Sequence, residues 1–545
     1  MIENPILPGF NPDPSICRVG DDYYIATSTF EWYPGVQIHH SRDLVNWTLV
    51  KRPLDRAAQL DMRGNPDSCG VWAPCLSHAD GKFWLVYTDV KRYSGNFKDT
   101  HNYIVTAPEI EGPWSDPVYV NSSGFDPSLF HDDDGRKWFM NMLWNHRSES
   151  VGGQPKSPGF AGILLQEWDA GSGQLVGEAV NVFRGSALGL VEGPHVFKRN
   201  GWYYMTVAEG GTGYDHAVTM ARSRRIDGPY ELHPHLHLIT SKDAPDAALQ
   251  RAGHGQIVET PQGAVYHTHL CSRPLPGSRR SPLGRETGIQ KCVWKEDDWL
   301  YLEHDGMVPA LRVPAPDAAA QALPNPPSHN VFNGDALPIE FQWLRTPFQQ
   351  RLFTLTGKSL RLYGRESIGS WFEQSLVARR QEHFAFRVET EVDFDPRNHQ
   401  QLAGLTHYYN QTKFHLLAVT WHELHGRVLT LFSCPASWPD GRLSFPLDAP
   451  IPLPAQGTVR LAATVAHDKL QFQLATQGDE WQDVGPVLDA SLISDEAGRG
   501  AFGSFTGAFV GMVACDMSGS ARPADFSRFS YVPNSNNEKI QRDSP

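Results

Sequence analysis

One pattern occurs five times in the first half of the chain, and this internal repeat constrains the fold more than any other feature of the sequence. Each copy has a short apolar stretch, a polar turn and a β-rich stretch, which together are typical of a β-hairpin. The copies are "DPSICRVGDDYYIATSTF" (13–30), "APCLSHADGKFWLVYTDV" (73–90), "DPSLFHDDDGRKWFMNML" (126–143), "GPHVFKRNGWYYMTVAEG" (193–210) and "GHGQIVETPQGAVYHTHL" (253–270). Such repetition predicts a fold built from one supersecondary unit per copy.

The residues between the copies predict two further strands in each unit. Segments such as "VQIHHSRDLVNWTLV" and "GIQKCVWKEDDWLYL" each offer two strands around a turn. Four strands in each of five units describe a five-bladed β-propeller, and no long segment has the 3.6-residue periodicity of a helix. We therefore predict an all-β protein in which residues 1–312 form a five-bladed β-propeller.

The repeat brings three acidic residues to equivalent places. In a propeller the innermost strand of every blade starts at the same mouth of a central channel. The residue before the shared proline opens this strand, at Asp13, Ala73, Asp126, Gly193 and, in the fifth copy, Gly253; Glu192 precedes Gly193. Three like charges at one mouth cost stability, so the repeat favours a role in chemistry over a role in capping turns. Because proline disfavours helical backbone in the preceding residue, we expect Asp13 and Asp126 to be extended.

Carboxyl groups around a sugar-sized pocket are typical of glycoside hydrolysis. A protonated group donates to the leaving oxygen, and an ionised group acts on the opposite face of the ring. Asp126 and Glu192 belong to neighbouring blades, so a negative Asp126 is expected to raise the pKa of Glu192. Asp13 is separated from Glu192 by blade 5. A gap of roughly 6.5–9.5 Å between those two carboxyl groups would admit a water molecule and predict inversion, which we expect, whereas about 5–5.5 Å would predict retention.

A proline- and alanine-rich stretch divides the chain. The segment "VPAPDAAAQALPNPPSHN" (313–330) is typical of a linker. Beyond it, segments such as "FAFRVETEVDF" (384–394) and "KLQFQLATQ" (469–477) alternate apolar and polar residues as half-buried strands do. We predict a second domain of two packed antiparallel sheets over residues 331–532, followed by a polar tail over residues 533–545.

The charge and the cysteine content of the chain argue against nucleic-acid and membrane partners and against an oxidising compartment. The formal net charge of −13 argues against a nucleic-acid partner. The chain has no run of about 18 apolar residues, so no membrane-spanning helix is predicted. The start "MIENPILPGF" lacks the basic and apolar regions of a secretory signal. The seven cysteines are scattered without a C-x-x-C pair, which indicates reduced thiols. We expect a cytoplasmic homo-oligomer with no nucleic-acid or membrane partner.

Several segments resemble the β-xylosidases of glycoside hydrolase family 43. The segment "NPILPGFNPDPSICRVGDDYYIATSTFEWYPGVQIHHSRDLVNW" is similar to the start of these enzymes, and "GFDPSLF", "VEGPHVFK", "LGRETGIQ" and "FTGAFVGM" follow in the same order, from about residue 4 to about residue 532. The resemblance implies a propeller followed by a lectin-like (concanavalin-like) β-sandwich. It also implies inverting exo-hydrolysis of β-1,4-xylo-oligosaccharides from the non-reducing end. In the family's motifs Asp13 is the general base, Asp126 orients and tunes the acid, and Glu192 is the general acid.

Further residues are expected to contact the sugar. Arg285 has a fork of donors that suits bidentate bonds to sugar hydroxyls and to the base carboxylate, with a rim ion pair to Glu286 as the alternative. The resemblance places aromatic residues such as Phe30 and Trp72, and less directly Trp144, against the terminal xylose, with core packing as the alternative for each. Phe509 matches an aromatic residue that the sandwich lends to the mouth. The expected substrate-binding residues are Phe30, Trp72, Trp144, Thr212, Arg285 and Phe509.

His254 takes the place of the repeat's proline in the fifth copy and should face the channel. In similar enzymes a histidine here lies near the axis, in some with a hydrated calcium ion. A neutral imidazole alone is a poor calcium ligand, because calcium prefers oxygen. A water-bonded His254 and a structural calcium ion beside it therefore stay open as alternatives, and no cofactor is required for the chemistry.

Two other functions stay open at this point. An α-L-arabinofuranosidase would use the same pocket, either as the main activity or beside xylosidase activity. A non-catalytic sugar-binding lectin is the alternative from a different class, since propellers and sandwiches both carry such sites. A lectin would not need Asp13, Asp126 and Glu192 together.

Overall fold

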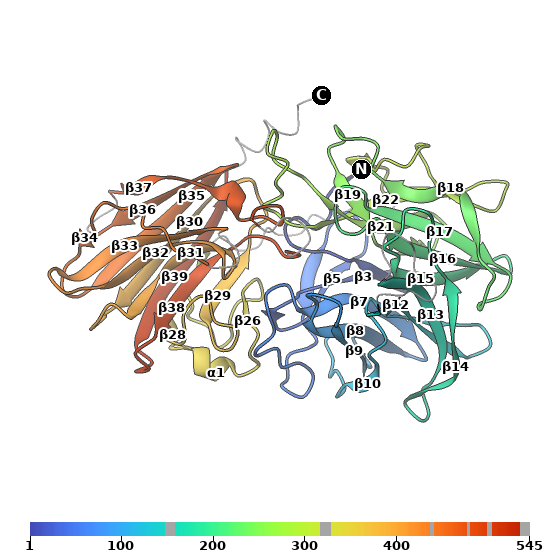
Figure 1. Cartoon of the computed structure of the whole chain (residues 1–545), viewed down its shortest axis with the longest axis horizontal. Coiled ribbons are helices and arrows are strands. Elements are labelled where there is room, and N and C mark those ends of the chain that lie inside the picture. Colours follow the sequence, from blue (N-terminus) through green and yellow to red (C-terminus); the bar gives the residue numbers. More distant parts are fainter. Residues whose placement is uncertain (148–158, 317–328, 437–440, 477–479, 499–503, 535–545) are drawn as a thin grey trace.

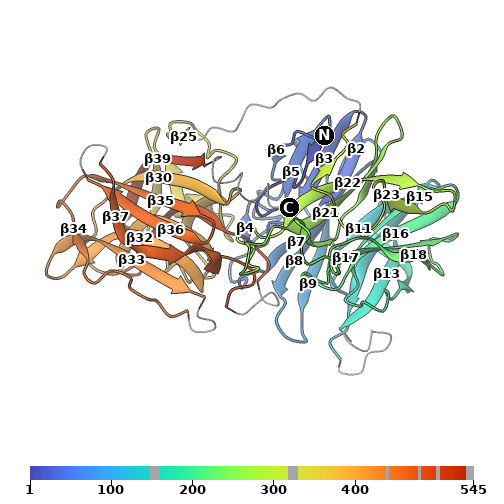
Figure 2. The ribbon, with the colours of Figure 1, turned by 90° about the horizontal axis from the view of Figure 1, so that it is seen from above.

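The computed structural model describes residues 1–147, 159–316, 329–436, 441–476, 480–498 and 504–534. These residues form a five-bladed β-propeller and a two-sheet β-sandwich that lie side by side (Figures 1 and 2), as predicted. Most of the predicted linker (313–330) and of the predicted tail (533–545) falls outside the described residues. Within the described ranges the helical elements are α1 (Gln349–Leu352) and one short 3-10 turn, η1 (Ala490–Leu492).

Each blade of the propeller is an antiparallel sheet made from consecutive parts of the chain. The strands of blades 1 and 2 are β2 (Ser15–Val19), β3 (Asp22–Thr27), β5 (Gln37–Ser41), β6 (Thr48–Lys51), β7 (Gly70–Ala79), β8 (Lys82–Arg92), β9 (Asp99–Ala107) and β10 (Val118–Asn121). Those of blades 3 and 4 are β11 (Ser128–His131), β12 (Lys137–Trp144), β13 (Phe160–Asp169), β14 (Gln174–Phe183), β15 (Glu192–Arg199), β16 (Trp202–Glu209), β17 (Ala217–Ser223) and β18 (Glu231–Thr240). Those of blade 5 are β19 (Gln250–Gly253), β20 (Ile257–Glu259), β21 (Val265–Ser272), β22 (Glu286–Trp294) and β23 (Leu300–Leu302).

The ring closes through contacts between the first and last blades. Strand β1 (Ile2–Glu3) pairs with β24 (Arg312–Val313), so both ends of the propeller chain are tied together. At the inner strands, the side chain of Gln256 in blade 5 accepts hydrogen bonds from the Ser15 hydroxyl (2.7 Å) and the Ile16 amide (3.1 Å) of blade 1. These bonds satisfy buried polar groups that the seam between the blades would otherwise leave unpaired.

The sandwich consists, in the described residues, of two eight-stranded antiparallel sheets. One sheet contains β27 (Phe353–Leu355), β28 (Leu360–Tyr363), β39 (Pro523–Pro533), β30 (Ala385–Phe394), β35 (Thr458–Ala466), β36 (Lys469–Ala475), β37 (Gln482–Asp489) and β25 (His329–Asn330). The other contains β34 (Ile451–Pro452), β33 (Gly426–Pro435), β32 (Lys413–His422), β31 (Gln401–Asn410), β38 (Phe509–Asp516), β29 (Ser375–Arg380), β26 (Gln342–Leu344) and β4 (Trp32–Tyr33). In β30 the apolar side chains of Phe386, Val388 and Val392 are buried and alternate with more exposed polar ones, as the two-residue period predicts.

The propeller chain itself contributes an edge strand to the sandwich. Strand β4 leaves blade 1 and pairs with β26, with Trp32 opposite Leu344 and Tyr33 opposite Trp343. The side chains of Trp32 and Tyr33 are buried, and the core of the sandwich is continuous with apolar residues of the first two blades. The two domains therefore share part of their apolar core, which is stabilised by the apolar area removed from water.

The backbone at the start of the inner strands differs from the prediction. Asp13 and Asp126 are not extended but left-handed, with φ of 57° and 54°, and Ala73 and Gly193 at the equivalent positions also have positive φ. In blade 5 the left-handed residue is His254 (φ 41°), one residue later than the sequence repeat indicates. The strand pairing shifts register at this point in blades 2 and 4, and in blade 5 just before it, between Gln250 and Gly253. In blades 1 and 3 the pairing begins after the acid, at Ser15 and Ser128, and Asp tolerates left-handed backbone better than most residues.

Candidate active site

A cavity of about 180 Å³ opens at the mouth of the propeller, where the inner strands begin. It is small beside the roughly 300–1,000 Å³ of sites for larger ligands, and it therefore suits a single small sugar ring. Most of the residues predicted from the sequence line it, namely Asp13, Asp126, Glu192, Phe30, Trp72, Thr212, Arg285 and His254. Trp144 and Phe509 do not line it.

Asp13 is buried and held by charged and polar partners. The Ser28 hydroxyl donates to its Oδ2 (2.7 Å), and Arg285 Nη1 donates to its Oδ1 (2.9 Å). Burial acts to raise the pKa of Asp13, but the charges of Arg285 and His254 and the bond from Ser28 outweigh it, so this pKa lies below its ordinary value. Asp13 is therefore ionised at neutral pH, as a general base must be.

Asp126 and Glu192 behave in the opposite way. Burial raises the pKa of Glu192 to about 8, and the negative charge of Asp13 adds to this effect. Burial and the charges of Glu192 and Asp13 raise the pKa of Asp126 well above its ordinary value. The pKa of Glu192 is raised as predicted, although the charge that raises it is that of Asp13 rather than of Asp126. The set thus combines one carboxyl group whose pKa is lowered, Asp13, with two whose pKa is raised, and Glu192, at about 8, holds a proton at neutral pH.

Asp126 is tied directly to the strand that carries Glu192. The Gly193 amide donates a hydrogen bond to the Asp126 carboxyl group. Gly193 has a left-handed φ of 57°, and a Cβ there would lie 2.8 Å from the His254 ring, so this close approach requires glycine. The arrangement packs blades 3, 4 and 5 closely around the acids.

His254 lies beside the carboxyl groups. Its Nδ1 is 3.8 Å from Asp13 Oδ1 and 4.0 Å from Asp126 Oδ2. Burial lowers the pKa of His254, so its ring is neutral at neutral pH. Burial lowers the pKa of the nearby His195 and His267, and the charge of His254 acts in the same direction on both. Among the described residues, no group of three or more His, Cys, Asp or Glu side chains is arranged to hold a metal ion.

Arg285 connects the propeller to the sandwich at the cavity. Besides its bond to Asp13, its Nη2 donates to the carbonyl of Phe505 (2.9 Å). The predicted alternative, an ion pair with Glu286, is not formed in the described structure, because Glu286 pairs instead with Arg273 (2.7 Å). Arg285 Nε is buried and has no hydrogen-bond partner within the described part of the chain.

Aromatic side chains form one connected part of the cavity wall. Trp72 contacts Phe30 (ring centroids 5.7 Å apart) and Phe125 (5.3 Å), and Phe505 packs against both Trp72 (5.8 Å) and Phe30 (6.4 Å). Phe505 comes from the sandwich, so the second domain does lend an aromatic ring to the cavity. Flat apolar rings of this kind suit the apolar face of a sugar.

The prediction that Phe509 supplies this ring is wrong. The ring comes from Phe505, four residues earlier in the chain. Phe509 is fully buried and stacks on Trp32, with ring centroids 3.7 Å apart. It is the first residue of β38, where pairing with Arg380 and Tyr408 fixes its side chain in the interface core. Phe505 lies before this strand begins and is free to turn toward the cavity.

Trp144 lies one layer behind the wall. Its indole N–H donates to the Asn96 carbonyl (2.7 Å), and its ring packs against Phe160, which does line the cavity. Lys98, a cavity residue that the sequence reasoning missed, places Nζ 4.3 Å from the centre of the Trp144 ring. Burial lowers the pKa of Lys98 to about 8, and the charge of Glu192 acts against this shift. Lys98 lies in the loop between β8 and β9 of blade 2 and belongs to no repeated motif, so nothing in the sequence marks it as a cavity residue.

Comparisons with known proteins agree with this geometry. The model of glycosyl hydrolases family 43 matches residues 2–300, and the model of the β-xylosidase C-terminal concanavalin A-like domain matches residues 329–532. The chain is 60% identical over 535 residues to xylosidase/arabinosidase 43B of Humicola insolens, with 98% of each chain covered. It is 47% identical over 542 residues to a β-xylosidase of Bacillus subtilis (strain 168), covering 97% of this chain and 99% of the relative. The crystal structure of xylan β-1,4-xylosidase from Bacillus halodurans C-125 superposes with a TM-score of 0.94 at 50% identity, covering 98% of this chain and 100% of that one.

Proposed function

This chain belongs to glycosyl hydrolases family 43, and on that premise we propose that it is an exo-acting β-1,4-xylosidase, which releases xylose from the non-reducing end of xylo-oligosaccharides. The observation that carries the proposal is the set of three buried carboxyl groups, with opposed pKa shifts, around a cavity of about 180 Å³. A lectin has no need for such a set.

The carboxyl groups divide the chemistry between them. Glu192 holds a proton at neutral pH and is the general acid that protonates the leaving oxygen. Asp13 is ionised and is the general base that activates a water molecule on the other face of the sugar. Asp126, tied to the backbone of Gly193, keeps Glu192 in position. Arg285 holds Asp13 and, as a residue that lines the cavity, is placed to bond a sugar hydroxyl.

The shape of the cavity supports attack at the chain end. The aromatic wall of Phe30, Trp72 and Phe505 closes the cavity around one sugar ring. Because a cavity of this volume holds one ring, the remainder of a xylo-oligosaccharide must extend outward through the mouth. The terminal sugar is therefore the one that is cut off.

The proposal is tested with 4-nitrophenyl β-xyloside, xylobiose and 4-nitrophenyl α-arabinofuranoside. We expect hydrolysis of both xylosides, loss of activity in Asp13→Ala, and α-xylose as the first product seen by NMR, because an inverting reaction changes the configuration of the anomeric carbon. Initial formation of β-xylose would rule out inversion. Full turnover by Asp13→Ala would rule out the assignment of the base.

An α-L-arabinofuranosidase activity is the second candidate. It is supported by the name of the Humicola insolens relative, a xylosidase/arabinosidase that is 60% identical to this chain. The same three carboxyl groups would serve both substrates, since the reactive bond of an arabinofuranoside presents a similar geometry. The ratio of the two kcat/KM values decides which activity is the main one.

Three further points belong to the proposal. A structural calcium ion beside His254 would be held largely through water, because the described residues around it offer no oxygen-rich cage; a rise in Tm with added CaCl₂, reversed by chelator, would support it. The expected homo-oligomer is tested by sedimentation. The cytoplasmic location is supported by seven free cysteines. No helix in the described ranges is long and apolar enough to cross a membrane.

A further inference from the structure

A short part of the sandwich chain, residues 504–508, completes the wall of the cavity and is bonded to the propeller along its length. The Phe505 amide donates to the Ser68 hydroxyl (3.1 Å), and the Ala508 amide donates to the Pro282 carbonyl (3.0 Å). Between them the chain passes Gly284, where a Cβ would lie 2.5 Å from the Thr506 carbonyl oxygen. The wall segment is thus seated closely on blade 5, and its position decides where the Phe505 ring lies.

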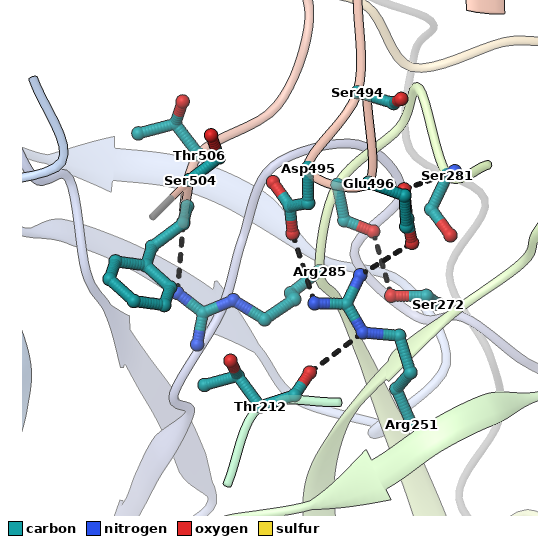
Figure 3. Close-up of polar contacts among 12 residues, drawn as sticks. Thr212, Arg251, Ser272, Ser281, Arg285, Ser494, Asp495, Glu496, Ser504 and Thr506 are labelled. Atoms are coloured by element: carbon teal, nitrogen blue, oxygen red, sulfur yellow. Dashed lines mark hydrogen bonds and ion pairs between the residues drawn. The ribbon is translucent and has the colours of Figure 1, made fainter. Parts of the chain in front are cut away.

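An ion cluster at the same interface consists of Arg251 of blade 5 with Asp495 and Glu496 of the sandwich (Figure 3). Arg251 is fully buried, and its Nη2 and Nη1 donate to Asp495 Oδ2 and Glu496 Oε1, each at 3.0 Å. The third arm of the guanidinium, Nε, donates to the carbonyl of Thr212 (2.7 Å), a residue that lines the cavity. One guanidinium therefore bonds both domains and the cavity wall of blade 4.

The two acids of this ion cluster extend its bonds to the wall segment. The Tyr409 hydroxyl donates to Asp495 Oδ1 and accepts a hydrogen bond from the Thr506 amide (2.9 Å). Glu496 Oε2 accepts from the Ser281 amide (2.9 Å), beside the Pro282 carbonyl to which the wall segment is bonded. Arg251 is thus linked through one carboxylate and one phenol to the residue that follows Phe505.

The strained backbone of Arg251 points to the same conclusion. Its φ is 54°, a left-handed value. A residue other than glycine adopts such backbone only at a cost in conformational energy, and it persists where the surroundings enforce it. The three directed bonds of the side chain supply that constraint. The Arg251 cation and the Asp495 carboxylate are both fully buried, which is favourable only while each keeps its partner, so the ion cluster has one stable arrangement.

We propose that the Arg251–Asp495–Glu496 ion cluster is a positioning device that fixes Phe505 and Thr212 at the cavity and thereby sets the affinity for the terminal sugar, while proton transfer depends on Asp13 and Glu192. This inference rests on the proposed xylosidase function. Arg251 touches no carboxyl group of the catalytic set in the described structure, and its contacts all lead to the wall. The three residues are positioning residues, and their effect falls on KM more than on kcat.

The test measures kcat and KM for 4-nitrophenyl β-xyloside in Arg251→Met and in a triple variant that adds Asp495→Asn and Glu496→Gln. We expect kcat/KM to fall by up to about 100-fold, mostly through KM, because a wall displaced by about 1 Å has effects of this size. The acid and basic limbs of the pH profile should stay where the wild type has them. In the triple variant no buried carboxylate is left without a cation, so Tm should recover while KM stays high.

Arg52→Met is the matched control. Arg52 is also a buried arginine between the domains, bonded to the Gln37 side chain and to the carbonyls of Ile339 and Phe341, but it does not line the cavity that holds Asp13 and Glu192. We expect it to lower Tm and to leave KM unchanged.

Three outcomes would overturn the inference. They are a wild-type KM in folded Arg251→Met, a wild-type KM in the triple variant, or an equal rise of KM in Arg52→Met. Should both Arg251→Met proteins fail to fold, Arg251→Lys, which keeps the buried charge but cannot make all three bonds, gives the deciding KM. If the wild type itself cleaves neither xyloside nor arabinofuranoside, the proposed function fails instead, and the two failures are told apart.

Discussion

Replacing Arg285 by methionine removes the cation that keeps the proposed base ionised. In the structure Arg285 Nη1 lies 2.9 Å from Asp13 Oδ1, and both side chains are buried. Two unit charges about 4 Å apart attract one another by about 4 kcal/mol at an effective dielectric constant of about 20. This attraction is what offsets the burial of Asp13, so its loss leaves burial unopposed except by His254 and Ser28.

The expected result is a displaced acid limb in the pH profile of kcat/KM. A neighbouring arginine lowers the pKa of a carboxyl group by about one to three units, so the limb should move toward neutral pH by about that amount. The sign follows from the role of a base: the wild type keeps its activity until the pH falls through the depressed pKa of Asp13, and the variant loses activity at a higher pH.

The assay is the pH dependence of kcat/KM for 4-nitrophenyl β-xyloside in wild type, Arg285→Met and Arg285→Lys. Both variants should lose activity at every pH, because the proposed contact of Arg285 with the sugar is removed, but only the limb position reports on Asp13. Arg285→Lys keeps a positive charge, so its limb should lie between the other two. Identical acid limbs in all three proteins would refute the assignment of Asp13 as a base tuned by Arg285.

Four other predictions concern the acid and the wall. Glu192→Gln should lower kcat for xylobiose by about 10²–10⁴-fold and less for an aryl xyloside with a good leaving group; equal losses on both substrates would contradict its role as acid. The wild-type kcat/KM should fall above about pH 8, where Glu192 loses its proton, and Lys98→Met should move this basic limb upward, because the Lys98 cation lowers the pKa of Glu192. Phe505→Ala should raise KM for the xyloside with little change in Tm, as kinetics and melting curves together would show. Phe509→Ala should instead destabilise the protein by about 3–5 kcal/mol in denaturant unfolding with KM unchanged, and the reverse pattern in these two variants would restore Phe509 to the cavity.

The repeat predicts that the three proposed catalytic residues meet. Asp13 and Asp126 lie just before the inner strands of two blades, and Glu192 begins the inner strand of a third, so the symmetry of the propeller brings them to one mouth regardless of the details of packing. The alternation in β30 and its neighbours predicted the sandwich in the same way. Periodic patterns carry this information because they depend only on which face of a strand is buried.

What failed depended on single residues rather than on a pattern. Phe505 and Phe509 stand four residues apart, and which of them faces the cavity is decided by where β38 begins, which the sequence does not mark. The left-handed backbone of Asp13 and Asp126 departs from the prediction because the proline that follows each acid gives only a local preference, which the packing of the blade overrides. Lys98 was missed because it approaches Glu192 from another blade, a contact that only the closed ring creates.

The pairing of β4 with β26 has a consequence for how such chains can be recombined. Trp32 and Tyr33, near the start of the chain, form the edge strand of a sheet whose other strands all come from beyond residue 341. The point where the chain passes from one domain to the other therefore does not mark the boundary between the two folded domains. A chimera that joins this propeller to the sandwich of a relative would pair β4 of this chain with a sheet from the other protein. The residue that replaces Phe509 would then have to stack on a Trp32 that comes from a different chain. A domain exchange in this architecture would therefore have to move β4 together with the C-terminal domain.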